Sequence, residues 1–279
     1  MKRTEEKKGP AIVTLITDFG YRGEYAGAMK GAILKVNPRC QIIDITHQVS
    51  PQNILEAAFV LKNSYPYFPE GTIHVVVVDP GVGGERRPIV LRKGGHRFVG
   101  PDNGVFSFVL PAEGEGEGYE IARRIFIRTP PSPTFHGRDV FAPVAGHLSM
   151  GLKLREVGPS VKDFVRLDWP KPHPEGLKWI GQVLWADAFG NLITNFLENE
   201  WKTRLLRTPF SIGGKKWEIQ KIHRTYSEGP RGAPMALFGS SGFLEIALRD
   251  GNAEKTLGLR AGDPIAIQFK SKGRIGEKR

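Results

Sequence analysis

The stretch that most constrains the fold is HVVVVDPGVGGERR at residues 74–87. Its apolar run, residues 75–78, is typical of a strand buried on both faces, which is the usual case in a parallel sheet. Asp79 then falls at the carboxyl end of that strand, where open α/β sheets place their ligands. A glycine-rich turn and two arginines follow. Asp79 and Arg86 therefore either form a functional site together, or Asp79 only caps the turn and the arginines are solvated.

Strand and helix patterns alternate through the first 80 residues. Strand patterns cover residues 11–17, 41–45 and 75–78, and helical patterns cover residues 24–36 and 53–65. Such alternation predicts βαβ units with right-handed crossovers and hence a parallel sheet. We therefore expect an N-terminal α/β domain over residues 10–168, Rossmann-like and with a mostly parallel sheet. A short helix is also expected at residues 104–110.

The pattern changes near residue 168. Residues 168–176, DWPKPHPEG, contain three prolines and no hydrophobic periodicity, which is typical of a linker. Beyond them short apolar strands follow one another without a convincing long helix, and the basic stretch at residues 202–224 also has a β pattern. This predicts a smaller, all-β, barrel-like domain over residues 177–270.

The net charge of +11 suggests an anionic partner, but much of it lies at the chain ends. Residues 1–8 contribute +2 and residues 270–279 contribute +4. No recognised nucleic-acid motif accompanies the basic stretch at residues 202–224. No apolar run is long enough to span a bilayer, and the start does not resemble a signal peptide. The single cysteine, Cys40, fits a reducing compartment. We expect a cytoplasmic protein with no nucleic-acid or membrane partner.

Polar side chains follow several other predicted strands. Asp18 could bind a ribose diol or cap a turn. His136, in FHGRD at a predicted helix start, is either a proton-transfer group or a structural histidine. Asp187 and Asn191 flank a glycine and Ser240 lies in GSSG, so all three could bind a polar ligand. Spacing alone favours a hairpin turn for the segment that holds Asp187 and Asn191. There is no P-loop, G-x-S-x-G or zinc signature.

Taken in order, these segments resemble the S-adenosylmethionine hydroxide adenosyltransferases, homologues of the fluorinating and chlorinating adenosyl transferases. The resemblance runs from about residue 12 to residue 269. Its carriers are LITDFG (15–20), YAGAMKG (25–31), DITHQV (44–49), VVDPGVGGERR (77–87), GPDNGVF (100–106), TFHGRD (134–139), DAFGNLITN (187–195) and SSGFLEIA (240–247). Each segment is weak alone, but their common order across both predicted domains is specific.

The resemblance implies hydrolysis of S-adenosyl-L-methionine, in which water attacks the ribose C5′ and gives adenosine and L-methionine. It implies no cofactor and no metal. It also implies a homotrimer whose active sites lie between the first domain of one subunit and the β domain of the next. By resemblance, Asp79, Arg86 and His136 handle the attacking water, and the halogenating relatives lack this set.

The resemblance also assigns the groups that hold the substrate. Asp18 would hold the ribose hydroxyls, Asp187 and Ser240 the methionine part, and Asn191 would face the adenine.

Three positions depart from the family pattern. Gly23 stands where an acidic residue is common, with Glu24 next to it, and Gly84 stands where a hydroxyl residue is common. Arg87 beside Arg86 leaves the arginine assignment open by one position.

Three other functions remain open at this point. A non-catalytic module that binds adenosine or S-adenosylmethionine would bind without turnover. A halide-dependent transferase would yield a 5′-halo-adenosine. Nucleic-acid binding through residues 202–224 would depend strongly on salt.

Overall fold

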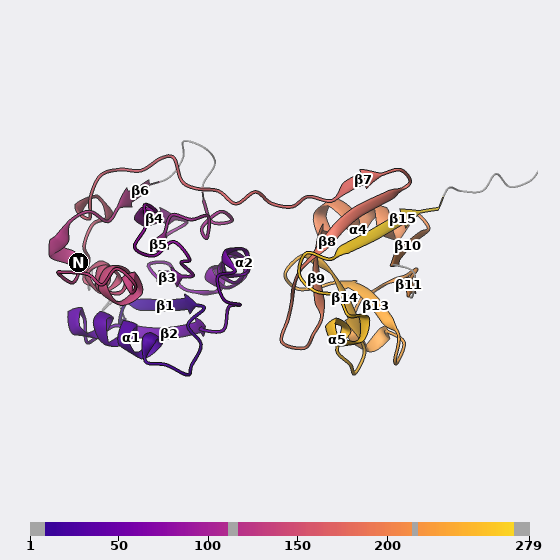
Figure 1. Cartoon of the computed structure of the whole chain (residues 1–279), viewed down its shortest axis with the longest axis horizontal. Helices are drawn as coiled ribbons and strands as arrows, with labels where there is room; N and C mark the ends of the chain where they lie inside the picture. Colours follow the sequence, from indigo (N-terminus) through magenta and orange to yellow (C-terminus); the bar gives the residue numbers. More distant parts are fainter. Residues whose placement is uncertain (1–8, 111–116, 214–216, 271–279) are drawn as a thin grey trace, which may run out of the picture. The chain divides into compact units, whose positions relative to one another are not determined.

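The computed structural model describes residues 9–110, 117–213 and 217–270. The chain divides between Leu167 and Asp168 into two compact units, each with its own sheet (Figure 1). The fold is therefore a mixed α/β fold with two sheets. The charged chain ends, residues 1–8 and 271–279, lie outside the described residues.

The N-terminal unit is built on a six-stranded sheet in the order β2-β1-β3-β5-β4-β6. Its strands are β1 (Ile12–Thr17), β2 (Gln41–Thr46), β3 (Ile73–Val77), β4 (Pro88–Lys93), β5 (His96–Pro101) and β6 (Glu117–Glu120). The first four strands of that order run parallel, and β4 and β6 continue the sheet in antiparallel fashion. The predicted β-α-β-α-β start with parallel strands is confirmed.

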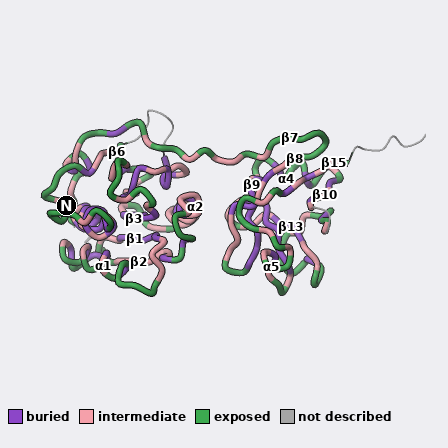
Figure 2. Tube along the Cα trace, in the orientation of Figure 1, coloured by how far each residue is buried: buried purple, intermediate pink, exposed green. Residues whose placement is uncertain are grey.

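Helices pack against both faces of this sheet. They are α1 (Tyr25–Val36), α2 (Ile54–Ser64) and α3 (Ala142–Ser149). Short 3-10 helices are η1 (Tyr65–Tyr67), η2 (Arg124–Phe126) and η4 (Leu154–Glu156), and η3 (Gly137–Phe141) is a π-helix that leads into α3. Alternate side chains of β3 point to opposite faces. Val75 and Val77 join the core beneath α1 and α3, whereas Val76 joins the core beneath α2. Buried positions accordingly concentrate on β1 and β3 (Figure 2).

The prediction of a helix at residues 104–110 is wrong. This segment forms consecutive turns, in which Ser107 N donates to Gly104 O and Val109 N donates to Phe106 O. Val105, Phe106 and Val109 are buried in the core, which explains their helix-like spacing. Their burial is achieved without a continuous helix.

The C-terminal unit is built on a nine-stranded sheet in the order β11-β10-β15-β8-β9-β14-β13-β12, with β7 paired to β8. Its strands are β7 (His173–Glu175), β8 (Lys178–Ala186), β9 (Leu192–Leu197), β10 (Phe210–Gly213), β11 (Glu218–Ile219), β12 (Ile222–His223), β13 (Pro234–Phe238), β14 (Phe243–Leu248) and β15 (Pro264–Phe269). All neighbours are antiparallel except β12 and β13.

The prediction that this unit is all-β is wrong, because it contains α4 (Glu198–Arg207), α5 (Ala253–Leu257) and the short η5 (Tyr226–Glu228). Helix α4 buries only Trp201 and Leu205, which are four residues apart on one face. The Trp201 ring meets that of Phe196 at 4.8 Å between centroids. The other residues of α4 are not buried, and two apolar positions are too few to predict a helix from the sequence. The β structure predicted for residues 202–224 is therefore wrong over the part that α4 occupies.

Within the described ranges, every helix is too short or too polar to cross a bilayer.

Candidate active site

The Asp79 carboxylate lies just beyond the carboxyl end of β3 and is held by Arg86. The Nε atom of Arg86 lies 3.0 Å from each carboxylate oxygen, and its Nη2 lies 2.5 Å from Oδ2. The two side chains are only 4% and 10% exposed. The guanidinium also lies over the buried ring of Phe141, 5.5 Å from its centre. A planar, permanently charged fork of this kind fixes the direction of the carboxylate.

His136 completes the cluster from a distant segment of the chain. Its Nδ1 atom lies 2.7 Å from Arg86 Nη2. Because arginine keeps its protons, Nδ1 must accept this hydrogen bond, and the neutral imidazole carries its proton on Nε2. Burial, and then the charge of Arg86, lower the pKa of His136 against the opposing charges of Asp79 and Asp139. At neutral pH His136 is therefore a neutral ring with Nε2–H as its donor.

Gly83 allows the two segments to meet. Its φ is +76°, in the left-handed region that glycine tolerates. A Cβ at this position would collide with the backbone carbonyl oxygen of Pro133, three residues before His136. Asn103 fixes the other side of the turn, because its Nδ2 donates to Val78 O at 2.9 Å. The glycine-rich turn is thus shaped for close approach of the segment that carries His136.

The neighbouring Arg87 points to different partners. Its Nε and Nη2 atoms lie 3.0 and 2.6 Å from Asp102 Oδ2, and its Nη1 lies 2.9 Å from Asp163 Oδ1. Arg87 therefore ties two loops of the N-terminal unit together. Of the two adjacent arginines, Arg86 is the one that contacts Asp79 and His136.

Asp18 lies at the same edge of the sheet. Strands β1 and β3 are parallel neighbours with Thr17 opposite Val77, so Asp18 and Asp79 both follow the ends of adjacent strands. Asp18 Oδ2 accepts a hydrogen bond from Gln52 N at 2.9 Å. The structure therefore brings this predicted ribose ligand to the edge that carries the Asp79 cluster. Glu24, by contrast, is exposed at the start of α1 and does not cap the helix with its side chain.

A buried polar chain supports the Asp18 turn. Thr17 Oγ1 accepts from Phe19 N at 3.2 Å and lies 2.8 Å from His47 Nδ1. His47 Nε2 lies 3.1 Å from Asp44 Oδ1, and Lys30 binds the same carboxylate. Thr17 and His47 are fully buried. The contacts of His47 with Thr17 and Asp44 make it a structural support of this turn.

In the C-terminal unit, Asp187 closes the hairpin between β8 and β9. Its Oδ1 accepts from the backbone N–H groups of Phe189 and Asn191, each at 2.9 Å, and its Oδ2 accepts from Asn191 Nδ2 at 2.9 Å. The hairpin interpretation of this segment is therefore confirmed. The same two residues also border a pocket.

This pocket has a volume of about 800 Å³ and lies within the C-terminal unit. Three predicted substrate residues, Asp187, Asn191 and Ser240, line it. Tyr226 and Glu245, which the sequence analysis did not single out, line it as well. Its size suits a small organic ligand, and its polar groups could fix the ligand's orientation.

Glu245 is the most unusual side chain of this pocket, because its residue is only 6% exposed. Tyr226 Oη donates to Glu245 Oε2 at 2.6 Å. Burial, reinforced by the charge of Asp187, raises the pKa of Glu245 against the effect of Tyr226. A Cβ on Gly239 would collide with this carboxylate. A single charged residue inside the otherwise apolar β14 is the sequence signal that could have revealed it.

The structure thus forms two clusters, one in each unit. The N-terminal unit brings together Asp79, Arg86 and His136, with Asp18 on the same sheet edge. The C-terminal unit gathers the other three predicted residues around its pocket. Within the described residues, no three His, Cys, Asp or Glu side chains are arranged to hold a metal ion.

Comparison with known proteins identifies relatives along almost the whole chain. An (R)-S-adenosyl-L-methionine hydrolase from Thermus thermophilus is 36% identical over 273 residues, covering 91% of this chain and 98% of that protein. An (R)-S-adenosyl-L-methionine hydrolase from Methanocaldococcus jannaschii is 38% identical, covering 92% and 96%. The crystal structure of an uncharacterized conserved protein from Thermotoga maritima superposes with a TM-score of 0.83 at 38% identity, covering 92% of this chain and 99% of that one.

Two family models match the two halves of the chain. The SAM hydroxide adenosyltransferase N-terminal domain matches residues 13–158, and the corresponding C-terminal domain matches residues 181–266. These matches cover the Asp79 cluster and the pocket at Asp187 alike. The chain therefore belongs to the SAM hydroxide adenosyltransferase family.

Proposed function

We propose that this protein is an enzyme that hydrolyses S-adenosyl-L-methionine to adenosine and L-methionine. Two relatives that carry the name (R)-S-adenosyl-L-methionine hydrolase match more than nine-tenths of the chain. The observation that carries the proposal is the contact of Asp79, Arg86 and His136 at the carboxyl end of β3. This cluster has the polarity that a water nucleophile requires.

The nucleophile in this proposal is a water molecule held by Asp79 and His136. Arg86 donates hydrogen bonds to one side of the Asp79 carboxylate and to the Nδ1 atom of His136. The free lone pairs of the carboxylate can accept a water proton, and Nε2–H can donate to the water oxygen. The second lone pair of that oxygen then points at the ribose C5′. Holding water in line with C5′ in this way supplies most of the required catalysis.

The chemical step is a displacement at C5′. A bond forms between the water oxygen and C5′, while the bond between C5′ and the sulfonium sulfur breaks and its electron pair stays on sulfur. Methionine leaves as a neutral thioether, so no acid is needed at the leaving group. The proton of the new hydroxyl passes to Asp79 and then to solvent. Because the sulfonium already activates C5′, the proposal needs no cofactor.

The remaining site residues would bind the rest of the substrate. Asp18 would accept hydrogen bonds from the ribose hydroxyls, and Asn191 would face the adenine. Asp187 and Ser240 would hold the methionine part. Although Asp187 already accepts three hydrogen bonds within its hairpin, a carboxylate has about four acceptor positions, so it can also accept from the ammonium group.

Halide-dependent transfer is the main alternative reaction. Water both donates and accepts hydrogen bonds, whereas a halide ion only accepts them. A site that presents a carboxylate on one side and an N–H on the other therefore suits water better. The Asp79 carboxylate would also repel an anion that approached C5′.

We further propose how the chain is assembled. The N-terminal unit would act as a Rossmann-like domain and the C-terminal unit as a barrel-like domain. Three chains would form a homotrimer in the cytoplasm, each active site combining the N-terminal unit of one subunit with the C-terminal unit of the next. The family resemblance supports this arrangement, and the division of the proposed substrate residues between the two units is consistent with it.

The proposed function is tested with the purified chain and S-adenosyl-L-methionine, with and without added chloride or fluoride. Liquid chromatography and mass spectrometry should find adenosine and methionine in equal amounts, independent of halide. Asp79→Asn keeps the shape of the side chain and should abolish most turnover while substrate still binds. Saturable binding with no turnover in the natural chain would instead indicate a binding module.

A further inference from the structure

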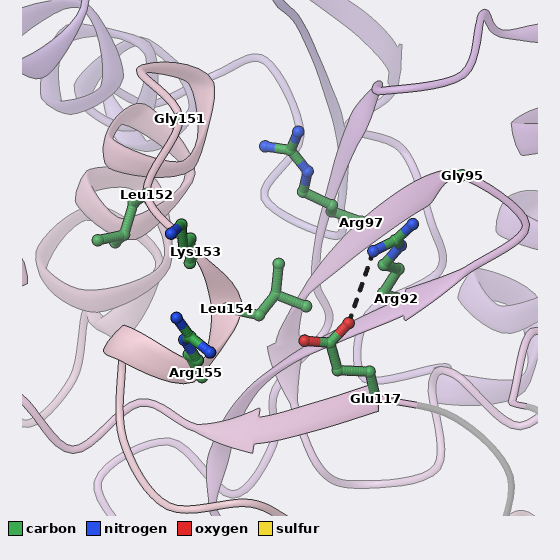
Figure 3. A pocket seen from close by; sticks show the side chains of 9 residues that line it. All are labelled: Arg92, Gly95, Arg97, Glu117, Gly151, Leu152, Lys153, Leu154 and Arg155. Carbon is green, nitrogen blue, oxygen red and sulfur yellow. Dashed lines mark ion pairs between the residues drawn. The ribbon is translucent and has the colours of Figure 1, made fainter.

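The N-terminal unit contains a second pocket, of about 550 Å³, that none of the candidate active-site residues lines. Figure 3 shows its two walls. One wall is made by strands β4, β5 and β6. The other is the segment at residues 151–155, which follows α3 and enters η4. We call this hollow the basic pocket because four of its lining residues are Arg or Lys.

The sheet wall carries a row of three charges. Arg92 on β4 is the direct partner of Arg97 on β5 and of Glu117 on β6. Side chains at paired positions point to the same face, so the side chains of Arg92, Arg97 and Glu117 leave the sheet as neighbours on one face. Like charges directly opposite one another destabilise a sheet. Within the described residues, the ion pair that offsets this repulsion is a long one, with 3.7 Å between Arg92 Nη1 and Glu117 Oε2.

The opposite wall adds more positive charge. Lys153 and Arg155 are exposed there, while Leu154 between them is 7% exposed and belongs to the hydrophobic core. Among the described residues, no carboxylate lies within ion-pair distance of Lys153, Arg155 or Arg97. The residues that line the basic pocket therefore include four cationic side chains and one carboxylate.

Arg97 is the most constrained of these cations. Its Nη1 atom donates to Leu148 O at 2.7 Å, near the end of α3. Burial, followed by the charge of Arg92, lowers the pKa of Arg97. The fold thus holds a guanidinium in a place where its charge is partly desolvated and unfavourable. A bound anion would reverse that penalty.

We propose that the basic pocket binds the oligophosphate group of a small molecule. Guanidinium forks match the oxygen geometry of phosphate, and Arg92 and Arg97 offer two of them from paired positions on one face of the sheet. The volume is within the range of small-molecule sites and exceeds what a single phosphate fills. Lys153 and Arg155 line the opposite wall and would neutralise a second phosphate. The ligand is a free oligophosphate or one attached to a nucleoside.

The test is a calorimetric titration of the full chain with tripolyphosphate and, separately, with ATP. Excess adenosine in both titrations occupies any adenosine site elsewhere. Saturable binding of both with similar affinity identifies the phosphate chain as sufficient, and much tighter binding of ATP identifies a nucleotide. Both outcomes support the proposal. The absence of saturable binding by either compound overturns it.

Two variants locate the bound anion. Arg92→Gln and Lys153→Gln each remove one charge from opposite walls, and both positions are solvent-accessible, so folding should be retained. Each should weaken tripolyphosphate binding about tenfold, the usual value of one charged hydrogen bond. Arg39→Gln, an exposed position in the turn between α1 and β2, is the matched control and should change nothing.

Equal affinity in all three variants would overturn the proposal, because binding would then reflect the overall positive charge of the chain. Turnover of S-adenosyl-L-methionine should be the same in Arg92→Gln as in the natural chain. This measurement separates the two proposals, because anion binding at the basic pocket can fail while hydrolysis is retained, and hydrolysis can fail while anion binding is retained.

Discussion

At the scale of single residues, two adjacent arginines have separate tasks. Arg86 binds Asp79 and His136 and fixes both the direction of the carboxylate and the tautomer of the imidazole. Arg87 binds Asp102, whose side chain is 3% exposed, and Asp163 on a separate loop. One arginine therefore belongs to the candidate active site and the other to the scaffold.

This division predicts opposite effects for two equivalent substitutions. Arg86→Gln should lower kcat about a hundredfold, because the water-holding groups lose their orientation. Arg87→Gln should leave kcat nearly unchanged but lower stability by about 1–3 kcal/mol, since Asp102 remains buried without its partner. Steady-state kinetics and thermal unfolding of both variants check this. Equal losses of kcat in both variants would contradict the assignment.

The residue types of this cluster are predictable from the sequence, and the family resemblance indicates Arg86 but leaves the assignment open by one position. Asp79 is recognisable because it follows a buried strand, and His136 because it opens a helix. Arg86 and Arg87 stand in one turn, and their side-chain directions depend on backbone angles that the sequence does not reveal. Glu245 and Tyr226 were missed because their pairing joins a strand to a turn 19 residues away.

At the scale of elements, a row of aromatic and polar side chains crosses the parallel part of the first sheet. Thr14 on β1, His74 on β3 and Phe98 on β5 are direct partners. His74 is fully buried, with Nδ1 2.8 Å from Thr14 Oγ1 and Nε2 3.2 Å from His96 Nδ1. The sheet thus contains a buried histidine that must stay neutral.

This histidine makes the N-terminal unit sensitive to acid. Burial, and then the charge of His96, lower the pKa of His74 to about 3 from the usual 6.5. Between these values the unfolded chain binds a proton that the folded chain does not, so stability falls as pH drops. At about pH 5 the loss from His74 alone should be about 2 kcal/mol relative to neutral or higher pH.

Urea unfolding of the natural chain and of His74→Gln, at neutral and acidic pH, measures this effect. The variant should lose less stability on acidification than the natural chain. All five tryptophans lie in the C-terminal unit, so tryptophan fluorescence reports the unfolding of that unit alone. Circular dichroism reports the unfolding of both units, so the difference between the two signals gives the stability of the N-terminal unit. The same acid dependence in both chains would exclude His74 as its source.

Elements with strong hydrophobic periodicity were predictable and elements stabilised by a few contacts were not. The β1, α1, β2, α2 and β3 series follows from its apolar spacing alone. Helix α4 depends on Trp201 and Leu205 packing into a core supplied by strands before and after it in the sequence. The sequence of α4 is itself too polar to predict that this segment forms a helix packed against a sheet.

At the scale of the whole molecule, the proposed site residues are divided between two units. Asp79, Arg86, His136 and Asp18 belong to the N-terminal unit, and the residues proposed for methionine and adenine belong to the C-terminal unit. In the proposed homotrimer, each active site takes its two halves from different subunits. This arrangement can be tested by combining inactive chains.

Asp79→Asn and Asp187→Ala should each be inactive alone, but coexpression should restore activity. A site is complete when its N-terminal unit comes from the Asp187 variant and its C-terminal unit from the Asp79 variant. Random assembly into a ring gives about a quarter of the natural activity per site. Light scattering of the same samples gives the number of subunits. No restoration in mixed oligomers would contradict sites shared between subunits.

Turnover in water enriched in heavy oxygen tests the proposed attack of water at C5′ most directly. Adenosine should gain one heavy oxygen, in its 5′-hydroxyl, and methionine should gain none, because water attacks C5′ and sulfur keeps its electron pair. Fragment masses of the adenosine place the label on the ribose. Unlabelled adenosine formed in the same water would contradict attack of water at C5′ and, with it, the role assigned to Asp79 and His136.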